Sequence, residues 1–340
     1  MVQNQWAKPE FDANGDVRVS AFTLPLSGLV SEEAAAFQRM RATMPMFDAG
    51  GGVETDIAVR REQINAYAAQ GVARLRQAFA VDTVSTTIGG VAVIDVTPAD
   101  GGHDPDRVLI NLHGGAFSMG WDGIALMEAI PIAAMGRYRV VTVNYRMAPE
   151  HRHPAGVEDV AAVYAALLQD YAPGRIGIYG GSAGGALTAQ AAAWLPAHGL
   201  PQAGAVGIFG AGGVPFHAGE SAYVAGYIDG SFPPPAVNGI TLDDITRGYF
   251  AACDPRDASA WPGYHVDVLA AFPPTLIITG TRAMDLSPAI FTNSQLIKAG
   301  VRSTLIVGES MGHCYHYQID LPEGRDAVAA ILAFFRENLV

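Results

Sequence analysis

Short runs of Val, Ile, Leu and Ala recur through the last two thirds of the chain, and helical stretches lie between them. The runs are continuously apolar, which is typical of strands buried on both faces of a sheet. We expect strands at residues 108–112, 140–144, 175–179, 205–209, 275–279 and 304–307. We expect helices at residues 157–168, 183–195, 287–299 and 325–339. This alternation predicts an α/β fold with a mostly parallel central sheet flanked by helices.

The first eighty residues follow a different pattern, and we expect them to be helical. Ser31 followed by Glu32 and Glu33 is typical of a helix start, because a hydroxyl caps free N–H groups and acids favour the positive end of the helix dipole. Apolar residues at helical spacing then define one stripe, formed by Ile64, Tyr67, Ala68, Val72, Leu75 and Phe79. The pair Gly89-Gly90 predicts the turn of an antiparallel hairpin between strands at 84–88 and 91–96.

One stretch, residues 211–266, is too long for a simple crossover between two strands. It is rich in Gly, Pro and aromatic residues, and we interpret it as an insertion. The expected organisation is a main domain at residues 81–210 and 267–340, an N-terminal helical cap at 1–80 and a second cap segment at 211–266.

Composition narrows the class of protein. Of the 340 residues, 50% are hydrophobic and 16% are charged, as expected for a globular chain with a large buried core. The net charge of −12, without any Lys/Arg cluster, argues against a nucleic-acid partner. The first residues carry no apolar signal core, and the other apolar runs are strand-length or broken by Gly and Pro. We therefore expect a cytoplasmic protein with no membrane partner.

Ser182 stands in the sequence Gly180-Gly181-Ser182-Ala183-Gly184, between a predicted strand and a predicted helix. A serine on such a tight turn has strained backbone dihedrals, and neighbouring glycines avoid steric clashes. The pattern therefore indicates a nucleophilic serine. The alternatives are an ordinary glycine-rich turn or a phosphate-binding loop, but no Lys follows as a P-loop requires, and the glycine spacing does not fit a dinucleotide fingerprint.

A second glycine pair, Gly114-Gly115, follows His113 directly after the predicted strand 108–112. Consecutive glycines let the backbone approach a substrate and turn its N–H groups inward. When a serine attacks an ester, such donors stabilise the oxyanion that forms, by roughly 3–4 kcal/mol each. We assign the N–H groups of Gly114, Gly115 and Ala183 to an oxyanion hole. The alternative is a glycine turn without a ligand.

His313 follows the predicted strand 304–307 and is the candidate general base for Ser182. Asp285 is the only carboxylate in the loop after the predicted strand 275–279, so it is the candidate for orienting the imidazole. Its alternative role is to cap the helix that follows. The reserve candidate is Glu309, and Asp254 and Asp257 come after it.

The vicinity of His313, Cys314 and His316 also allows a metal site as an alternative. A zinc ion needs three or four ligands in workable geometry, and the sequence offers no complementary cluster. We expect neither a metal nor a cofactor.

These motifs resemble those of the bacterial hormone-sensitive-lipase-like esterases, a branch of the α/β-hydrolase superfamily. The resemblance extends from about Val84 onward and is carried by residues 113–117, 144–151, the turn at Ser182 and residues 311–313. The run Tyr-Arg-x-Ala-Pro-Glu-His at 145–151 is highly specific to the family, and we expect it to tie its loop to the floor of the site. The family usually has a third glycine where this chain has Ala116.

The resemblance also implies that the family's acid lies at the place of Ala283, whereas Asp285 stands two residues further on. It further implies a cap built from N-terminal helices and a segment after the sixth strand. Aromatic residues of this chain are candidates for the apolar lining beneath such a cap: Trp121, Phe216, Tyr223, Tyr227 and Phe232.

Together, the residues and the resemblance predict a serine carboxylesterase that hydrolyses small, apolar esters of short-to-medium acyl chains through an acyl-enzyme. A lactone hydrolase or an amidase would use the same residues. A non-catalytic small-molecule receptor on this fold would be expected to lack the histidine. The expected partner is a small-molecule ester, and a homodimer stays open.

Overall fold

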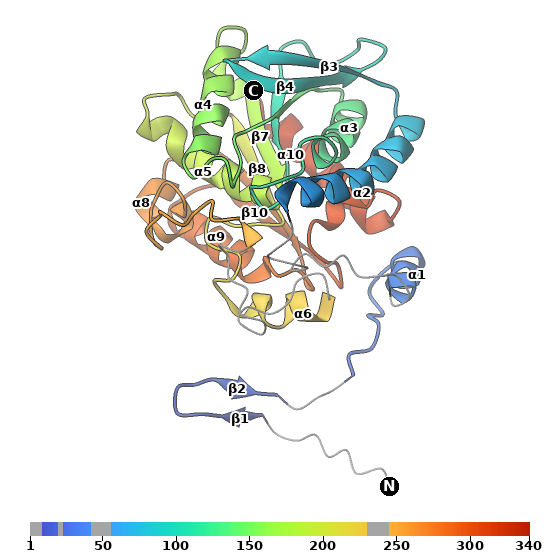
Figure 1. The fold of residues 1–340 in the computed structure, drawn as a ribbon, viewed down its shortest axis with the longest axis vertical. Coiled ribbons are helices and arrows are strands. Elements are labelled where there is room, and N and C mark those ends of the chain that lie inside the picture. Colours follow the sequence, from blue (N-terminus) through green and yellow to red (C-terminus); the bar gives the residue numbers. More distant parts are fainter. Residues whose placement is uncertain (1–8, 20–22, 42–55, 230–244) are drawn as a thin grey trace.

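An eight-stranded sheet runs through the centre of the molecule, with helices packed on both sides (Figure 1). The computed structural model describes residues 9–19, 23–41, 56–229 and 245–340. The strands of the sheet are β3 (Val81–Ile88), β4 (Val91–Pro98), β5 (Val108–Leu112), β6 (Arg139–Val143), β7 (Ile176–Gly181), β8 (Ala205–Phe209), β9 (Thr275–Gly280) and β10 (Ser303–Gly308). The expected α/β-hydrolase architecture is confirmed, because every strand expected in the main domain is present within three residues of its predicted bounds.

The spatial order of the strands is β10-β9-β8-β7-β5-β6-β4-β3. The strands from β10 to β6 are parallel, and β4 and β3 extend this sheet in antiparallel fashion. Ile88 pairs with Val91 across Gly89 and Gly90, as the glycine pair predicts. The carboxyl ends of the parallel strands share one edge of the sheet, where ligands bind in folds of this kind.

Nine helices of four or more residues accompany the sheet within the described residues. They are α1 (Glu32–Arg41), α2 (Ile57–Ala78), α3 (Ile124–Gly136), α4 (Ala155–Leu167), α5 (Ala183–Ala197), α6 (Ala225–Asp229), α8 (Val266–Leu269), α9 (Leu286–Lys298) and α10 (Pro322–Asn338). In the described part of the chain, none of them is long and apolar enough to cross a membrane.

The sheet separates two hydrophobic cores. Val108, Ile110 and Leu112 of β5 point into the core beneath α4 and α5, whereas Leu109 points into the core beneath α3 and α10. Because successive side chains of a strand point to opposite faces, a continuously apolar strand serves both cores.

Helix α3 is the one long helix that the sequence pattern does not predict. Its sequence, IALMEAIPIAAMG, is apolar on almost every side and holds Pro131, so it shows no helical period. The structure explains this composition, because α3 lies between the sheet, α2 and α10. Glu128 is its only charged residue, and only 5% of its surface is exposed.

The N-terminal region is not helical throughout, which corrects the sequence-based expectation. Two short strands, β1 (Glu10–Phe11) and β2 (Val17–Arg18), form an exposed hairpin that stands apart from the sheet (Figure 1). Helix α1 begins as predicted, with Ser31 Oγ accepting the Ala34 N–H at 3.0 Å. In α2 the buried residues are Ile64, Ala68, Gly71 and Leu75, whereas Tyr67 is 65% exposed and lies outside the buried stripe.

Residues 211–229 and 245–266 contain mainly short helical turns, among them η2 (Glu220–Ala222), α6 and η3 (Pro262–Tyr264). Ser221 fastens the first part to the start of α9, because its Oγ donates to Met284 O at 2.6 Å and accepts the Ser287 N–H at 2.8 Å. This segment therefore lies against the loop between β9 and α9.

Candidate active site

Four loops at the carboxyl edge of the sheet carry the residues that the sequence singles out. His113 follows β5, Ser182 follows β7, Asp285 lies between β9 and α9, and His313 follows β10. Since β5 and β7 are neighbours, as are β9 and β10, the order of the strands brings distant parts of the sequence to one place.

Ser182 occupies a strained turn between β7 and α5. Its backbone has φ 57° and ψ −121°, a conformation that costs a residue with a side chain on the order of 1–3 kcal/mol. The neighbouring glycine is required by space, because a Cβ on Gly184 would overlap the carbonyl of Leu112. The Ser182 N–H donates to Phe209 O of β8 at 2.8 Å, which fixes the turn to the adjacent strand. We call residues 180–184 the nucleophile elbow.

The structure brings Ser182, His313 and Asp285 into one hydrogen-bonded line. His313 Nε2 lies 2.8 Å from Ser182 Oγ, and His313 Nδ1 lies 2.6 Å from Asp285 Oδ1. Asp285 is fully buried, and its Oδ2 accepts the Thr279 hydroxyl at 2.6 Å. A carboxylate that accepts at Nδ1 selects the tautomer whose Nε2 is free to take the serine proton.

The contacts of the candidate carboxylates do not support a capping role for Asp285 or an orienting role for Glu309, Asp254 or Asp257. Asp285 stands at the start of α9, but its side chain makes no capping hydrogen bond to the helix. Glu309 Oε1 instead accepts the Ser27 hydroxyl at 2.8 Å. Asp254 and Asp257 accept N–H groups within their own turns, from Arg256 and Ser259. Among the four carboxylates, Asp285 is the one that contacts His313.

The surroundings of His313 raise its pKa. Burial lowers its pKa, whereas Cys314 Sγ, 3.6 Å from Nε2, and the Asp285 carboxylate raise it, and the net pKa lies well above the ordinary value. His316 packs edge-on against Phe209, with ring centroids 5.2 Å apart. Burial lowers the pKa of His316 to about 3, so this residue is neutral.

Residues 113–118, here called the oxyanion loop, require one correction. The Gly114 N–H was expected to face an oxyanion, but it donates to Glu128 Oε1 at 2.9 Å. Among the described residues, no acceptor takes the N–H groups of Gly115, Ala116 or Ala183. The amides without an acceptor in the described part of the chain are therefore those of Gly115, Ala116 and Ala183, and the first and last of these were assigned to the oxyanion hole from the sequence.

The carbonyl of each peptide that carries an available N–H is held by the protein. Gly114 O lies 2.8 Å from His113 Nδ1, Gly115 O accepts the N–H groups of Ser118 and Met119 at 3.0 Å each, and Ser182 O accepts that of Ala186 at 3.0 Å. Burial lowers the pKa of His113 to about 4, so its ring is neutral and Nδ1 donates. Fixed peptide planes keep their N–H groups oriented before a substrate arrives.

Backbone strain and an aromatic stack mark the second half of the oxyanion loop. Ala116 and Phe117 both have positive φ, of 53° and 57°, which residues with side chains seldom adopt. The Phe117 ring is 1% exposed, stacks on Tyr249 at 4.6 Å and meets Phe250 edge-on at 5.0 Å. This packing holds the loop in a conformation that the backbone alone would not favour.

The family-specific run 145–151 supports the oxyanion loop from below. The Tyr145 hydroxyl donates to His113 O at 2.7 Å, and the Ala148 N–H donates to Phe117 O at 2.8 Å. Glu150 forms a bidentate pair with Arg61 of α2 at 2.7 and 2.8 Å. The same guanidinium donates to the carbonyls of Ser118 and Ala148. These residues thus fasten two loops and a helix to one another.

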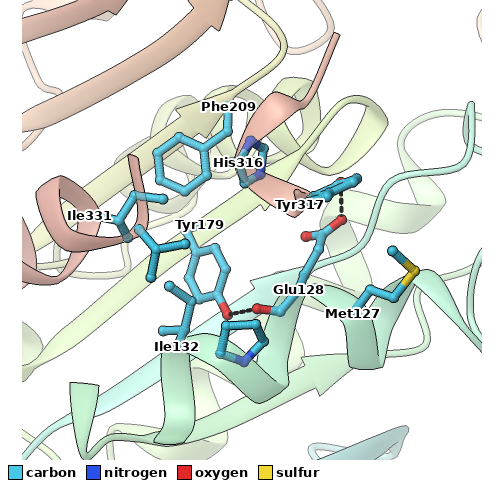
Figure 2. Close-up of a pocket in the computed structure, with 10 residues that line it drawn as sticks. Met127, Glu128, Ile132, Tyr179, Phe209, His316, Tyr317 and Ile331 are labelled. Atoms are coloured by element: carbon cyan, nitrogen blue, oxygen red, sulfur yellow. Dashed lines mark hydrogen bonds between the residues drawn. The ribbon is translucent and has the colours of Figure 1, made fainter. Parts of the chain in front are cut away.

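Glu128 is the residue near the site that sequence reasoning missed. Its carboxylate is buried directly beneath the oxyanion loop and the elbow, and Figure 2 shows it directed at the Tyr317 hydroxyl. Glu128 also lines a small cavity of about 10 Å³, about the size that one water molecule needs. A lone carboxylate within an otherwise apolar stretch was the available signal in the sequence.

The aromatic residues expected to line the substrate pocket fall into two groups. Phe216 lies edge-on to His313 with centroids 6.3 Å apart, and Trp121 lies 6.1 Å from His113. Tyr223 and Tyr227 are 53% and 67% exposed on residues 220–229, which we call the outer cap segment. Phe232 lies outside the described residues.

Comparison with known proteins places the chain in a family. A family model of the α/β-hydrolase fold matches residues 109–317. The acetyl-hydrolase of Streptomyces hygroscopicus is 32% identical over 253 residues, covering 74% of this chain and 81% of that protein. The crystal structure of esterase E25 superposes with a TM-score of 0.79 at 28% identity, covering 95% of this chain and 99% of that one.

An esterase of the bacterial hormone-sensitive lipase family superposes with a TM-score of 0.75 at 27% identity, covering 91% of this chain and 98% of that one. The resemblance noted from the motifs is thus confirmed over most of the chain. The chain belongs to the α/β-hydrolase family, among the hormone-sensitive-lipase-like esterases, and is a carboxylic ester hydrolase.

Proposed function

We propose that this enzyme hydrolyses small, apolar esters with short-to-medium acyl chains, with Ser182 as nucleophile, His313 as general base and Asp285 as the residue that orients the imidazole. The observation that carries the proposal is the line of hydrogen bonds from Ser182 Oγ to the buried Asp285 carboxylate. Three available amides, of Gly115, Ala116 and Ala183, lie on the two loops nearest to Ser182.

The reaction follows from these contacts in two stages. His313 Nε2 takes the Ser182 proton as Oγ bonds to the ester carbonyl carbon, and the three amides stabilise the oxyanion. The imidazolium then protonates the leaving alcohol, which departs and leaves an acyl-serine. Water attacks that acyl group with His313 again accepting a proton, and collapse of the second tetrahedral intermediate returns Ser182 and releases the acid.

Two observations support the substrate class. Phe216 and Trp121 supply apolar surface beside His313 and beside the oxyanion loop, and neither offers a charge to bind a charged ester. The relative from Streptomyces hygroscopicus is named an acetyl-hydrolase, which favours acetyl and other short acyl groups. We therefore place acetate and butyrate esters ahead of long-chain esters.

Turnover of p-nitrophenyl acetate and butyrate by the wild type and by Ser182→Ala tests the proposal. We expect kcat to fall by about 10⁶-fold or to background in the variant, as removal of the nucleophile does in other serine hydrolases. A panel with octanoate esters, a lactone and an anilide measures the substrate class. Equal turnover by the two proteins, or a preference for the lactone or anilide, would contradict it.

A further inference from the structure

We propose that Glu128 is a positioning residue of this site, whose buried carboxylate locks the oxyanion loop, the nucleophile elbow and the loop after His313 into one arrangement. The proposal rests on the proposed function, because it assigns Glu128 a part in the same reaction. Glu128 touches no reacting atom and would act through the backbone groups that it holds.

The carboxylate receives hydrogen bonds from four donors on separate parts of the chain. Oε1 accepts the Gly114 N–H at 2.9 Å and the Tyr317 hydroxyl, and Oε2 accepts Asn111 Nδ2 at 2.8 Å and the Gly181 N–H at 3.2 Å. Figure 2 shows Tyr317 and Glu128 meeting beside the cavity. An ionised carboxylate offers about four acceptor positions, so these donors saturate it.

The two backbone donors immediately precede groups proposed to act on the substrate. Gly114 comes one residue before the available amide of Gly115, and Gly181 comes one residue before Ser182. A Cβ on Gly114 would lie 3.0 Å from Gly181 O and 3.3 Å from Ser182 Cβ, so the two backbones are already in contact. One side chain bound to both therefore sets the distance between nucleophile and oxyanion donors.

The third connection of Glu128 reaches the loop that carries His313, the proposed general base. Tyr317 lies four residues after His313, in η4 (Tyr315–Tyr317), and packs edge-on against His316 with centroids 4.5 Å apart. Through its hydroxyl, the loop that carries His313 is joined to the same carboxylate. Asn111 completes the set and is itself held by Thr142, whose hydroxyl donates to Asn111 Oδ1 at 2.7 Å. The network thus extends from β6 through β5 to α3.

A carboxylate suits this place better than its amide analogue. All four partners are donors, and a glutamine would turn an NH₂ group toward two of them. Burying an unpaired N–H group costs about 1–3 kcal/mol, so the loops would shift to relieve the mismatch. Burial raises the pKa of Glu128 to about 7, while the four hydrogen bonds oppose that shift.

The test compares three variants with the wild type, all assayed well below their urea unfolding midpoints. Glu128→Gln removes the acceptor pattern, Tyr317→Phe removes one donor, and Met127→Leu changes an adjacent cavity residue that makes no polar contact with Glu128. We expect Glu128→Gln to lower kcat for p-nitrophenyl butyrate about 10- to 100-fold, because a small misplacement of reacting groups has effects of that size.

Two further readouts separate positioning from a loss of folded protein. KM in Glu128→Gln should stay within about twofold, and an alkyl boronic acid, which forms a tetrahedral adduct with the serine, should bind more weakly by the same factor as kcat falls. We expect Tyr317→Phe to show a smaller loss in the same direction, and Met127→Leu to match the wild type.

Unchanged kcat and boronate affinity in both Glu128→Gln and Tyr317→Phe would overturn the positioning role and leave the proposed function intact. A fall in kcat that matches the fraction of unfolded protein, with normal boronate affinity per folded molecule, would also overturn it. Absence of Ser182-dependent turnover in the wild type would overturn both proposals.

Discussion

Different contacts hold the floor of the site, meaning the oxyanion loop and the nucleophile elbow, and the outer cap segment above it. The oxyanion loop and the elbow are fixed by buried hydrogen bonds to Glu128, His113 and Tyr145 and by the packing of Phe117. The outer cap segment has two exposed tyrosines and is fastened through Ser221 and through Asp229, whose carboxylate pairs with Arg41 of α1 at 2.6 Å. The difference teaches that the groups proposed for the chemistry stand on a buried, hydrogen-bonded base, whereas the outer cap segment presents part of its aromatic surface to solvent.

After removal of the nucleophile, the largest effect should come from the buried acid. Replacing Asp285 by Asn removes the acceptor that selects the His313 tautomer, and we expect kcat to fall by about 10⁴-fold, the size of the corresponding loss in another serine hydrolase. Steady-state turnover of p-nitrophenyl butyrate measures it. Glu309→Gln is the matched control, since that carboxylate binds Ser27, and it should keep wild-type kcat. A near-normal rate in Asp285→Asn would remove Asp285 from the mechanism.

The next largest effect should be the dependence of activity on pH, through the protonation of His313. A general base must be neutral, and the pKa of His313 is raised well above its ordinary value. Activity should therefore be present above that pKa and be lost as pH falls through it, by about tenfold per pH unit and more steeply where Glu128, with a pKa of about 7, is protonated as well. Profiles of kcat/KM between pH 5 and 10 measure this limb. Asp285→Asn, which removes the negative charge, should shift the midpoint to lower pH, and an unchanged midpoint would contradict this assignment.

The smallest effect should come from the outer cap segment. Tyr227 is 67% exposed, so Tyr227→Ala should change the free energy of unfolding by about 0.5 kcal/mol or less. We expect kcat for p-nitrophenyl acetate to remain within about twofold, with any change confined to KM for longer esters. Chemical denaturation and a series of acyl lengths measure the two quantities. A tenfold loss of kcat for p-nitrophenyl acetate would show instead that this segment contributes to the chemical step, as the oxyanion loop and the elbow are proposed to do.

Much of the fold and of the candidate site follows from local patterns. The apolar runs predict the sheet because strands buried on both faces need no polar alternation. Ser182, His113 and His313 are recognisable because a strained turn and a close backbone approach require glycines beside them, and such glycines recur in the sequence.

Long-range contacts account for what the sequence pattern did not predict. Helix α3 has no polar face, because most of its surface is covered by the sheet, α2 and α10, and so it gives no periodic signal. The Gly114 N–H donates to the carboxylate of Glu128, which lies fourteen residues later in the sequence and beneath the loop. A local glycine pattern cannot predict such a contact. For Tyr67 the pattern predicted too much burial. Its helical spacing placed it in the apolar stripe, but the folded helix exposes it to solvent.

The stack of Phe117 on Tyr249 and Phe250 divides the inserted segment into a buried part that supports the oxyanion loop and an outer part that carries exposed tyrosines. Tyr249 and Phe250 are 0% and 6% exposed, and they press on the loop that carries the amides of Gly115 and Ala116. Under the proposed function, exchanges at the exposed Tyr223 and Tyr227 would leave this stack in place, whereas exchanges at Tyr249 or Phe250 would disturb the amides that every substrate uses. Changes of ester preference are therefore expected from the outer part of the insertion, and not from the residues of the stack.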